Sequence, residues 1–370
     1  MTKPFIDFYN SIGFAPTSQQ SDLRAEHKKN RDNLYRKLGL HTSTWTNASV
    51  LEVGPGSGEN SIDLITRGIG SLSLVDAVPA VLDQIKNRVP EEVKVSYQLL
   101  DLSDNVIEGF FEIVICEGVI PLQHKPKRFV ANVSKSVQYG GLMLITTADA
   151  VSLLSEVLRR FIAHKLLVIE VANLDEITNF FKEDFAALPS MTRNPKDWVL
   201  DSVLNPWVGD LFSIHDATQE LLCHGFQPVA QTPRIADDLA WYKEESSNTK
   251  VARAWEDKYL RNVHKLIDTR SMDLNSTSPE YNQILVTECS NIYSATKELI
   301  SNKSEAHEGI ILKSIENILS KCPQLSLETQ GSLRSILMWA ISHQDQDLNE
   351  FRGFWGRGQQ HILFERTRAQ

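Results

Sequence analysis

An apolar strand that runs directly into a glycine-rich turn and then a helix is the feature that most constrains this chain. Its sequence is Val50-Leu51-Glu52-Val53-Gly54-Pro55-Gly56-Ser57-Gly58-Glu59-Asn60-Ser61. Glycines permit backbone angles with φ > 0 and let the main chain approach a ligand without a Cβ in the way. The helix that follows presents unpaired N–H groups to the same crevice. The pattern therefore predicts a ligand site at the carboxyl end of a buried strand.

The spacing of these glycines differs from that of dinucleotide-binding turns. Those turns read G-x-G-x-x-G, whereas the third position here is taken by Glu59. An acidic residue at the mouth of a pyrophosphate site would repel the phosphates. Glu52, two residues before the first glycine, suits a ligand that carries an amine or another cation. A glycine turn with a purely structural role is the alternative.

Acidic residues also end the next predicted strands. Strands are expected near 71–75, 93–100 and 110–116. The residues that directly follow them are Asp76, Asp101 and Glu117, respectively. A carboxylate at the end of a second strand can accept hydrogen bonds from both hydroxyls of a ribose. For Asp76 the alternative is capping of the helix that begins near Pro79, and we favour the ribose interpretation.

These motifs together resemble those of class I S-adenosylmethionine-dependent methyltransferases, over about residues 48–148. The resemblance implies S-adenosyl-L-methionine as co-substrate. It implies that the following residues bind it: Glu52, Gly54, Pro55, Gly56, Gly58, Asp76, Ala77, Asp101, Leu102, Cys116 and Glu117. In that family the Asp76 position binds the ribose, the Asp101 position accepts from the adenine amine, and the Leu102 N–H donates to a ring nitrogen.

A helix that precedes the first strand often packs over the cofactor in the family resembled. By that analogy Tyr9, Arg31 and Tyr35 are candidate contacts. For Arg31 we expect a solvated helix face instead, and for Tyr35 packing between helices.

Strands that alternate with helices predict a parallel sheet with crossover helices. With the resemblance, the expected fold is α/β: a Rossmann-like, seven-stranded, mostly parallel sheet with an antiparallel last strand, helices on both faces, and helical insertions. The expected parts are an N-terminal arm and helix at 1–47, a cofactor-binding core at 48–150, a helical lid insertion at 151–212, more core at 213–239, a second helical insertion at 240–350 and a closing strand within 351–370. The lid is expected to cover an acceptor pocket.

Methyl transfer from a sulfonium depends mainly on alignment. Positioning can contribute on the order of 7 to 11 kcal/mol, whereas a general base adds roughly 10²- to 10⁴-fold. Candidate bases are Glu117 and His124, with a solvated loop position as the alternative for His124. Four aromatic residues are candidates for an acceptor pocket, with packing as their alternative role: Trp207, Trp241, Tyr242 and Trp355.

The motif N/D-P-P-Y/F of adenine and glutamine N-methyltransferases is missing after the fourth strand, where Glu117-Gly118-Val119-Ile120 stands. The expected function is methyl transfer to the O or N of a small molecule, such as a sugar or specialised metabolite. Two alternatives stay open. One is an aminopropyl transferase of the polyamine-synthase type, and the other is a cofactor-binding, non-catalytic partner subunit.

Charge and composition limit the classes of partner that this chain is expected to bind. The net charge of −9 argues against nucleic acid as principal partner, and no apolar run approaches the length of a membrane span. The four cysteines lie far apart and match no metal-ligand spacing, so we expect no bound metal. We also expect no disulfide framework and a location in the reducing cytoplasm. The oligomeric state and the acceptor stay open.

Overall fold

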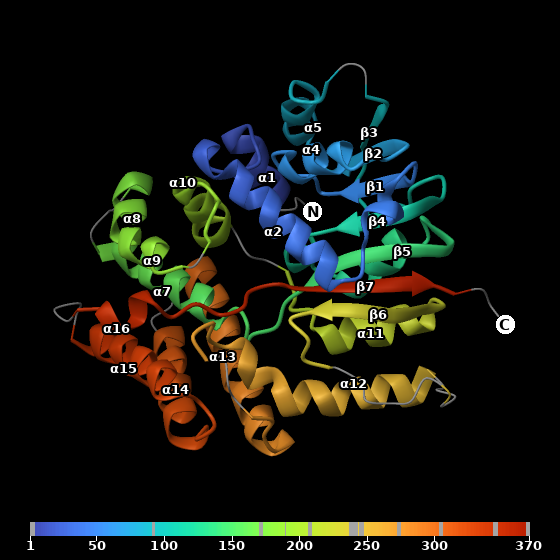
Figure 1. Ribbon diagram of the computed structural model, residues 1–370. Coiled ribbons are helices and arrows are strands. Elements are labelled where there is room, and N and C mark those ends of the chain that lie inside the picture. The colour runs from blue at the N-terminus through green and yellow to red at the C-terminus, as the bar shows by residue number, and fades with distance from the viewer. Residues whose placement is uncertain are drawn as a thin grey trace.

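A seven-stranded sheet forms the centre of the molecule in the computed structural model (Figure 1). The structure describes residues 4–90, 93–169, 173–188, 190–205, 209–236, 243, 248–271, 275–302, 306–342 and 347–367. The strands are β1 (Ser49–Val53), β2 (Ser71–Asp76), β3 (Val95–Leu99), β4 (Phe111–Cys116), β5 (Val137–Thr147), β6 (Phe226–Thr232) and β7 (Gln360–Arg366). Their spatial order is β3-β2-β1-β4-β5-β7-β6.

The sheet is parallel from β3 to β5, and β7 runs antiparallel between β5 and β6. This confirms the predicted Rossmann-like sheet with an antiparallel last strand. Because the carboxyl ends of β1, β2, β3 and β4 meet at one edge, the residues that follow these strands converge there.

Helices cover both faces, as the near-continuous apolar strands require. One face carries α2 (Arg24–Lys37), α3 (Thr42–Trp45), α4 (Glu59–Thr66) and α5 (Pro79–Lys86), and the other carries α6 (Pro126–Ser134) and α11 (Ile214–Cys223). Alternation along β1 shows the two cores: Val50 packs in the cluster with Leu64 and Leu82, whereas Leu51 packs with Phe129 and Leu221.

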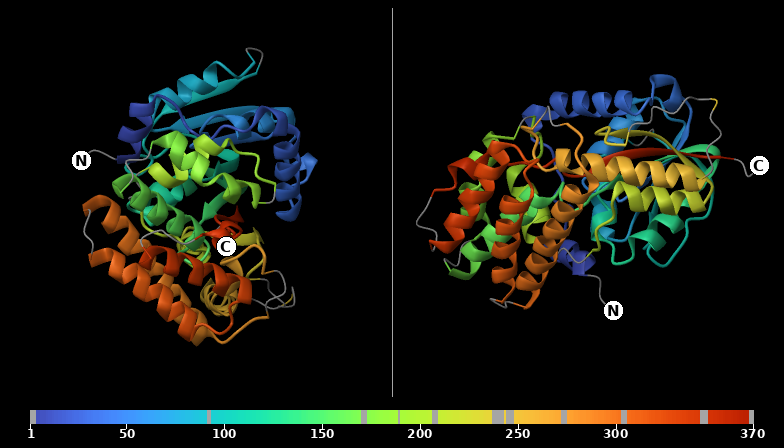
Figure 2. Two further views of the ribbon diagram at one scale, coloured as in Figure 1. Left: turned by 90° about the vertical axis from the view of Figure 1, so that its left-hand side faces the viewer. Right: turned by 90° about the horizontal axis from the view of Figure 1, so that it is seen from below.

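Most of the remaining helices form a second body beside the sheet (Figures 1 and 2). Before α11 come α7 (Leu154–Ile169), α8 (Leu174–Phe180), α9 (Lys182–Ala186), α10 (Pro195–Trp198) and the π-helix η3 (Val199–Leu204); between β6 and β7 come α12 (Asn248–Asn262), α13 (Pro279–Asn302), α14 (Ala306–Lys321), α15 (Leu327–Ile341) and α16 (Asn349–Arg352). Short elements are α1 (Pro4–Ile12) and the 3₁₀ turns η1 (Ser21–Leu23), η2 (Ile120–Leu122) and η4 (Val263–Leu266).

A buried ion cluster joins the two groups of inserted helices. Arg159 Nε of α7 donates to Asp184 Oδ1 of α9 at 3.0 Å, and Arg352 Nη1 of α16 donates to Asp184 Oδ2 at 2.6 Å. Arg159 also donates to the Phe354 carbonyl at 2.8 Å, and its guanidinium lies 3.6 Å from the ring centroid of Trp355. Segments nearly two hundred residues apart in sequence therefore share one core.

Strand β5 begins earlier than the sequence predicts. The sequence pattern predicts a helix over 125–137 and then a strand over 142–147 that Gly140 and Gly141 introduce. In the structure the helix ends at Ser134, and β5 starts at Val137 and includes both glycines. Gly140 has φ +77°, and the register with β4 shifts between Phe111 and Ile113. Such an irregularity lets a strand absorb residues that would otherwise end it.

Candidate functional site

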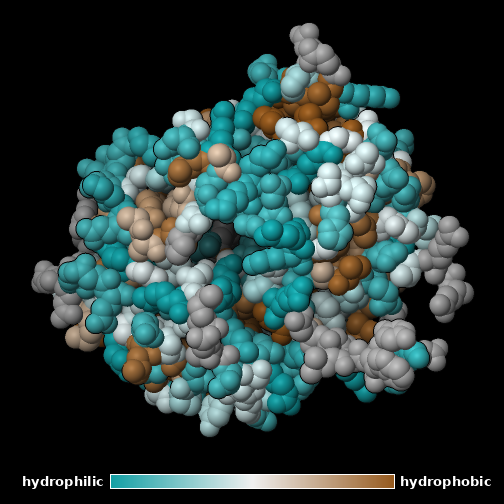
Figure 3. All heavy atoms as spheres, in the orientation of Figure 1, coloured by the Kyte–Doolittle hydropathy of each residue, from teal (hydrophilic) through white to brown (hydrophobic). Residues whose placement is uncertain are grey.

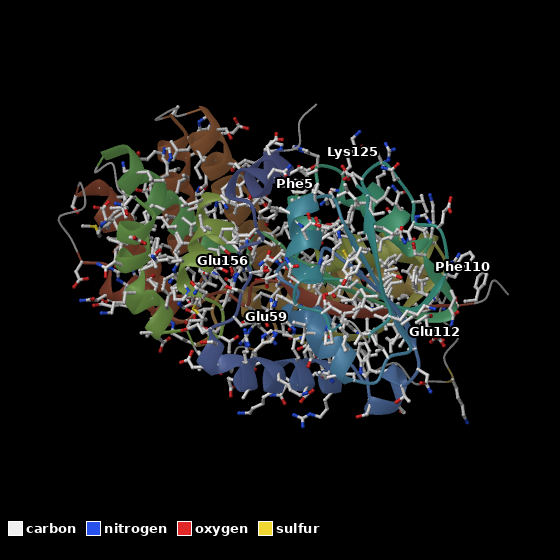
Figure 4. All side chains as sticks on the ribbon, turned by 90° about the horizontal axis from the view of Figure 1, so that it is seen from above. Phe5, Glu59, Phe110, Glu112, Lys125 and Glu156 are labelled. Carbon is white, nitrogen blue, oxygen red and sulfur yellow. The ribbon has the colours of Figure 1, made fainter. Side chains whose placement is uncertain are left out.

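A cavity opens at the carboxyl ends of β1, β2 and β4. The motif residues that line it are Gly54, Gly56, Asp76, Ala77, Asp101, Leu102 and Glu117. In Figure 4, Phe5, which also lines the cavity, lies near the middle of the molecule, whereas Phe110 and Glu112 lie at the far end of the sheet. The structure thus brings the ends of four predicted strands to one site.

The glycine turn has no room for side chains. Gly54 has φ +66°, and a Cβ there would lie 2.2 Å from Val119 Cγ2. Gly56 has φ +57°, and a Cβ there would lie 2.6 Å from Thr17 Oγ1, which accepts a hydrogen bond from the Ser57 N–H at 2.8 Å. The turn is therefore closed on two sides by the chain itself, with the N-terminal arm on one side.

Asp76 and Asp101 both line the cavity and are held by nearby backbone. Asp76 Oδ1 accepts from the Val78 N–H at 2.8 Å, and Asp101 Oδ1 accepts from the Ser103 N–H at 2.9 Å. The first turn of α5 has no side-chain cap, so capping, the alternative role for Asp76, is not seen. Burial raises the pKa of Asp76 to about 7.

Glu117 lies at the centre of a charged cluster. Its carboxylate accepts from Arg31 Nη1 at 2.9 Å and Nη2 at 2.7 Å, and its Oε1 is 2.9 Å from His361 Nε2 of β7. Burial alone would raise the pKa of Glu117, but Arg31 and His361 hold it well below its ordinary value. Glu117 is therefore an ionised acceptor with fixed partners.

Helix α2 contributes buried residues to this cluster. Arg31 is only 7% exposed, so the expected solvated face for Arg31 is wrong, because its partner Glu117 comes from a distant strand end. Tyr35 is buried with its ring 4.7 Å from that of Trp45, which confirms its packing role.

Several residues implied by the resemblance lie outside the cavity lining. Glu52 is buried, its Oε2 accepts from Ser61 Oγ at 2.5 Å, and burial raises its pKa to about 7. Cys116 is buried in β4, Pro55 lines a separate polar hollow, and a Cβ on Gly58 would lie 3.0 Å from Ile85 of α5.

The candidate base His124 and the candidate aromatic residues of the acceptor pocket also lie outside the cavity lining or outside the described residues. His124 is exposed and lies outside the lining. Trp355 is buried against Arg159 in the helical body, which is a packing role. Trp207, Trp241 and Tyr242 lie outside the described residues.

The sequence predicts a lid at 151–212 but not which of its side chains reach this cavity. Arg193 and Asp201 line it together with Tyr9 and Thr17 of the N-terminal arm. The arm and the insertion are joined by backbone hydrogen bonds, from the Gln20 N–H to the Thr192 carbonyl at 2.8 Å and from the Asn194 N–H to the Ser18 carbonyl at 3.0 Å. No periodicity or motif links segments this far apart, so only the fold reveals the pair.

A parallel sheet, a glycine turn after β1 and acidic residues at the next strand ends are together typical of nucleoside-binding α/β proteins. Residues 51–145 match the family model described as a methyltransferase domain. This part of the chain therefore resembles the class I, Rossmann-like methyltransferases, and the co-substrate of that family is S-adenosylmethionine. No curated protein matches the sequence of the chain.

Solved structures of methyltransferases are similar to parts of the chain. The N-methyltransferase NodS from Bradyrhizobium japonicum WM9 with S-adenosyl-L-homocysteine is 18% identical, over 32% of this chain and 62% of that one, with a TM-score of 0.29. Magnesium protoporphyrin IX methyltransferase (ChlM) from Synechocystis PCC 6803 with bound S-adenosyl-L-homocysteine is 14% identical, over 61% of this chain and 89% of that one, with a TM-score of 0.39. The chain thus spans less than two thirds of the first structure.

The described residues contain neither a membrane-spanning helix nor a cluster of metal ligands. No helix among them has both the length and the apolar character needed to cross a membrane. No group of three or more His, Cys, Asp or Glu side chains in the described ranges could hold a metal ion.

Proposed function

We propose that this chain transfers a methyl group from S-adenosylmethionine to an O- or N-nucleophile of a small molecule. The observation that carries the proposal is the convergence of the glycine turn, Asp76, Asp101 and Glu117 on one cavity. Asp76 would accept from the ribose hydroxyls and Asp101 from the adenine amine. The sulfonium would then lie beyond Gly54, near the end of β4.

Positioning accounts for most of the proposed catalysis. In the transfer, the acceptor atom bonds to the methyl carbon, and the sulfur leaves with the electron pair of the broken bond. The rigid partners of Glu117 favour a positioning role for this carboxylate, since a group with a strongly lowered pKa is a weak base at neutral pH.

The acceptor would approach through the space between the sheet and the inserted helices. Figure 3 shows a hollow near the middle of this face, with hydrophilic residues along its right side. A polar border on that side suits a hydrophilic acceptor, such as a sugar or a specialised metabolite. The proposed partner is therefore a small molecule, and a cytoplasmic location stays part of the proposal.

Two experiments test the proposal. Calorimetry should show binding of S-adenosylmethionine and S-adenosylhomocysteine at micromolar concentration, and Asp76→Ala should weaken it at least tenfold because the ribose acceptor is lost. No heat with either ligand at millimolar concentration would refute donor binding. A mass-detected screen with labelled donor and fractionated small molecules would then identify the acceptor, and a donor-binding protein that methylates none of the fractions would favour the non-catalytic subunit.

A further inference from the structure

Arg193 and Asp201 form an ion pair at one end of the donor cavity. Arg193 Nη2 lies 2.6 Å from Asp201 Oδ2, and both side chains are only about a fifth exposed, at 23% and 20%. Both residues come from the first insertion, outside the segment that matches the methyltransferase domain. The proposed function assigns neither of them a role.

The ion pair contains the positive charge of a cavity lining that is otherwise acidic. Among the described residues that line the cavity, Arg193 is the one cation, against the carboxylates of Asp76, Asp101, Glu117 and Asp201. The nearby cation Arg31 is bound to Glu117 through two N–H groups. Any ligand carboxylate in this cavity would therefore find its counter-charge at Arg193.

The pair has unused hydrogen-bonding capacity. Arg193 Nε is buried and has no partner among the described residues, while Nη2 donates to the Pro16 carbonyl at 2.5 Å as well as to Asp201. Asp201 Oδ1 accepts from the Tyr9 hydroxyl at 2.6 Å. A guanidinium has five N–H donors and a carboxylate about four acceptor positions, so each group can take one more partner.

The order of the strand ends places this pair at the amino-acid end of the donor. With adenine at Asp101 after β3 and ribose at Asp76 after β2, the remaining part of the donor extends past β1 toward β4. Arg193 reaches that region, because it binds Pro16, the neighbour of the Thr17 that caps the glycine turn. The amino-acid end carries one carboxylate and one ammonium, which match Arg193 and Asp201 in sign.

We infer that Arg193 binds the carboxylate and Asp201 the ammonium of the donor, so that the first insertion selects a donor with an intact amino-acid end. This inference rests on the proposed use of S-adenosylmethionine. It also separates the chain from aminopropyl transferases, because their decarboxylated donor would leave Arg193 without a ligand partner. Arginine suits the role, since its planar fork matches a carboxylate.

Three related ligands test the inference by calorimetry: S-adenosylhomocysteine, its decarboxylated analogue, and methylthioadenosine, which lacks the whole amino-acid end. Arg193→Ala should weaken S-adenosylhomocysteine about 10- to 100-fold and change the other two less than about threefold. Asp201→Asn should weaken both ligands that carry the ammonium and spare methylthioadenosine. Lys196→Ala is the matched control, because Lys196 is an exposed cation of the same insertion outside the cavity lining.

The ligand series separates a binding role from a structural one. If Arg193→Ala weakens all three ligands equally, or none, while the wild type binds S-adenosylhomocysteine, the inference is wrong. Arg193→Gln retains a donor for the Pro16 carbonyl and gives the same comparison if the alanine variant does not fold. If the wild-type protein binds none of the three at millimolar concentration, the proposed function itself fails.

Discussion

At the scale of residues, the buried carboxylates of the cavity tie donor binding to pH. Burial raises the pKa of Asp76 to about 7, and only an ionised carboxylate can accept from both ribose hydroxyls. We expect the affinity for S-adenosylhomocysteine to fall about tenfold from pH 8 to pH 6 as Asp76 takes up a proton. Calorimetry across this range checks the prediction. Asp76→Asn should bind weakly and with a flatter profile, and an unchanged slope in that variant would assign the titration elsewhere.

The same pKa shift has the opposite consequence for folding. The pKa of Asp76 in the folded chain lies above its ordinary value of 3.8. Its contribution to stability is therefore fully present below about pH 4 and is lost as the pH rises through about 7. The site thus holds a carboxylate that destabilises the free protein at neutral pH, and we attribute this to its place in a ligand cavity.

At the scale of elements, the buried carboxylate of Asp184 links α7, α9 and α16. It is fully buried and pairs with both Arg159 and Arg352. Asp184→Ala would leave two guanidinium groups without their buried partner, so we expect a loss of about 3 to 5 kcal/mol in the free energy of unfolding. Urea denaturation followed by circular dichroism measures it.

An exposed ion pair provides the control for that measurement. Lys313 and Glu316 on α14 are 69% and 49% exposed, and Lys313→Ala should change the free energy of unfolding by less than about 1 kcal/mol. Similar losses for Asp184→Ala and Lys313→Ala would contradict the structural role given to the buried cluster.

At the scale of the whole molecule, the inserted helices and one face of the sheet share a single core. One continuous apolar cluster includes Val114 of β4, Phe161 of α7, Ile292 of α13 and Trp339 of α15. We therefore expect one cooperative unfolding transition for the full chain, with equal calorimetric and van't Hoff enthalpies. Two separate transitions in calorimetry would show that the helical body folds independently.

Ligand binding should stabilise that single unit as a whole. At a free ligand concentration of about 100 times Kd, the gain is about 2.7 kcal/mol. S-adenosylhomocysteine should therefore raise the melting temperature without splitting the transition, as scanning calorimetry would record. A shift confined to part of the transition would place the donor cavity in an independently folding part.

The sequence by itself determined the sheet and most of the donor motifs. Apolar strands, a glycine turn and terminal acidic residues are local patterns, and a parallel sheet carries such strand ends to one edge whatever surrounds it. Asp76, Asp101 and Glu117 could therefore be assigned to one site from their positions in sequence alone. The start of strand β5 was predicted too late in the chain, because the local sequence at Gly140 does not reveal the irregular pairing of β5 with β4.

Only the tertiary structure decided which distant residues complete the site. Arg31 is buried because Glu117 meets it from another element, His361 reaches Glu117 because β7 inserts between β5 and β6, and Arg193 reaches the cavity because the arm and the insertion bind each other. Each of these contacts joins segments more than eighty residues apart. Such pairings depend on the packing of whole elements, and a helical or strand period carries no information about them.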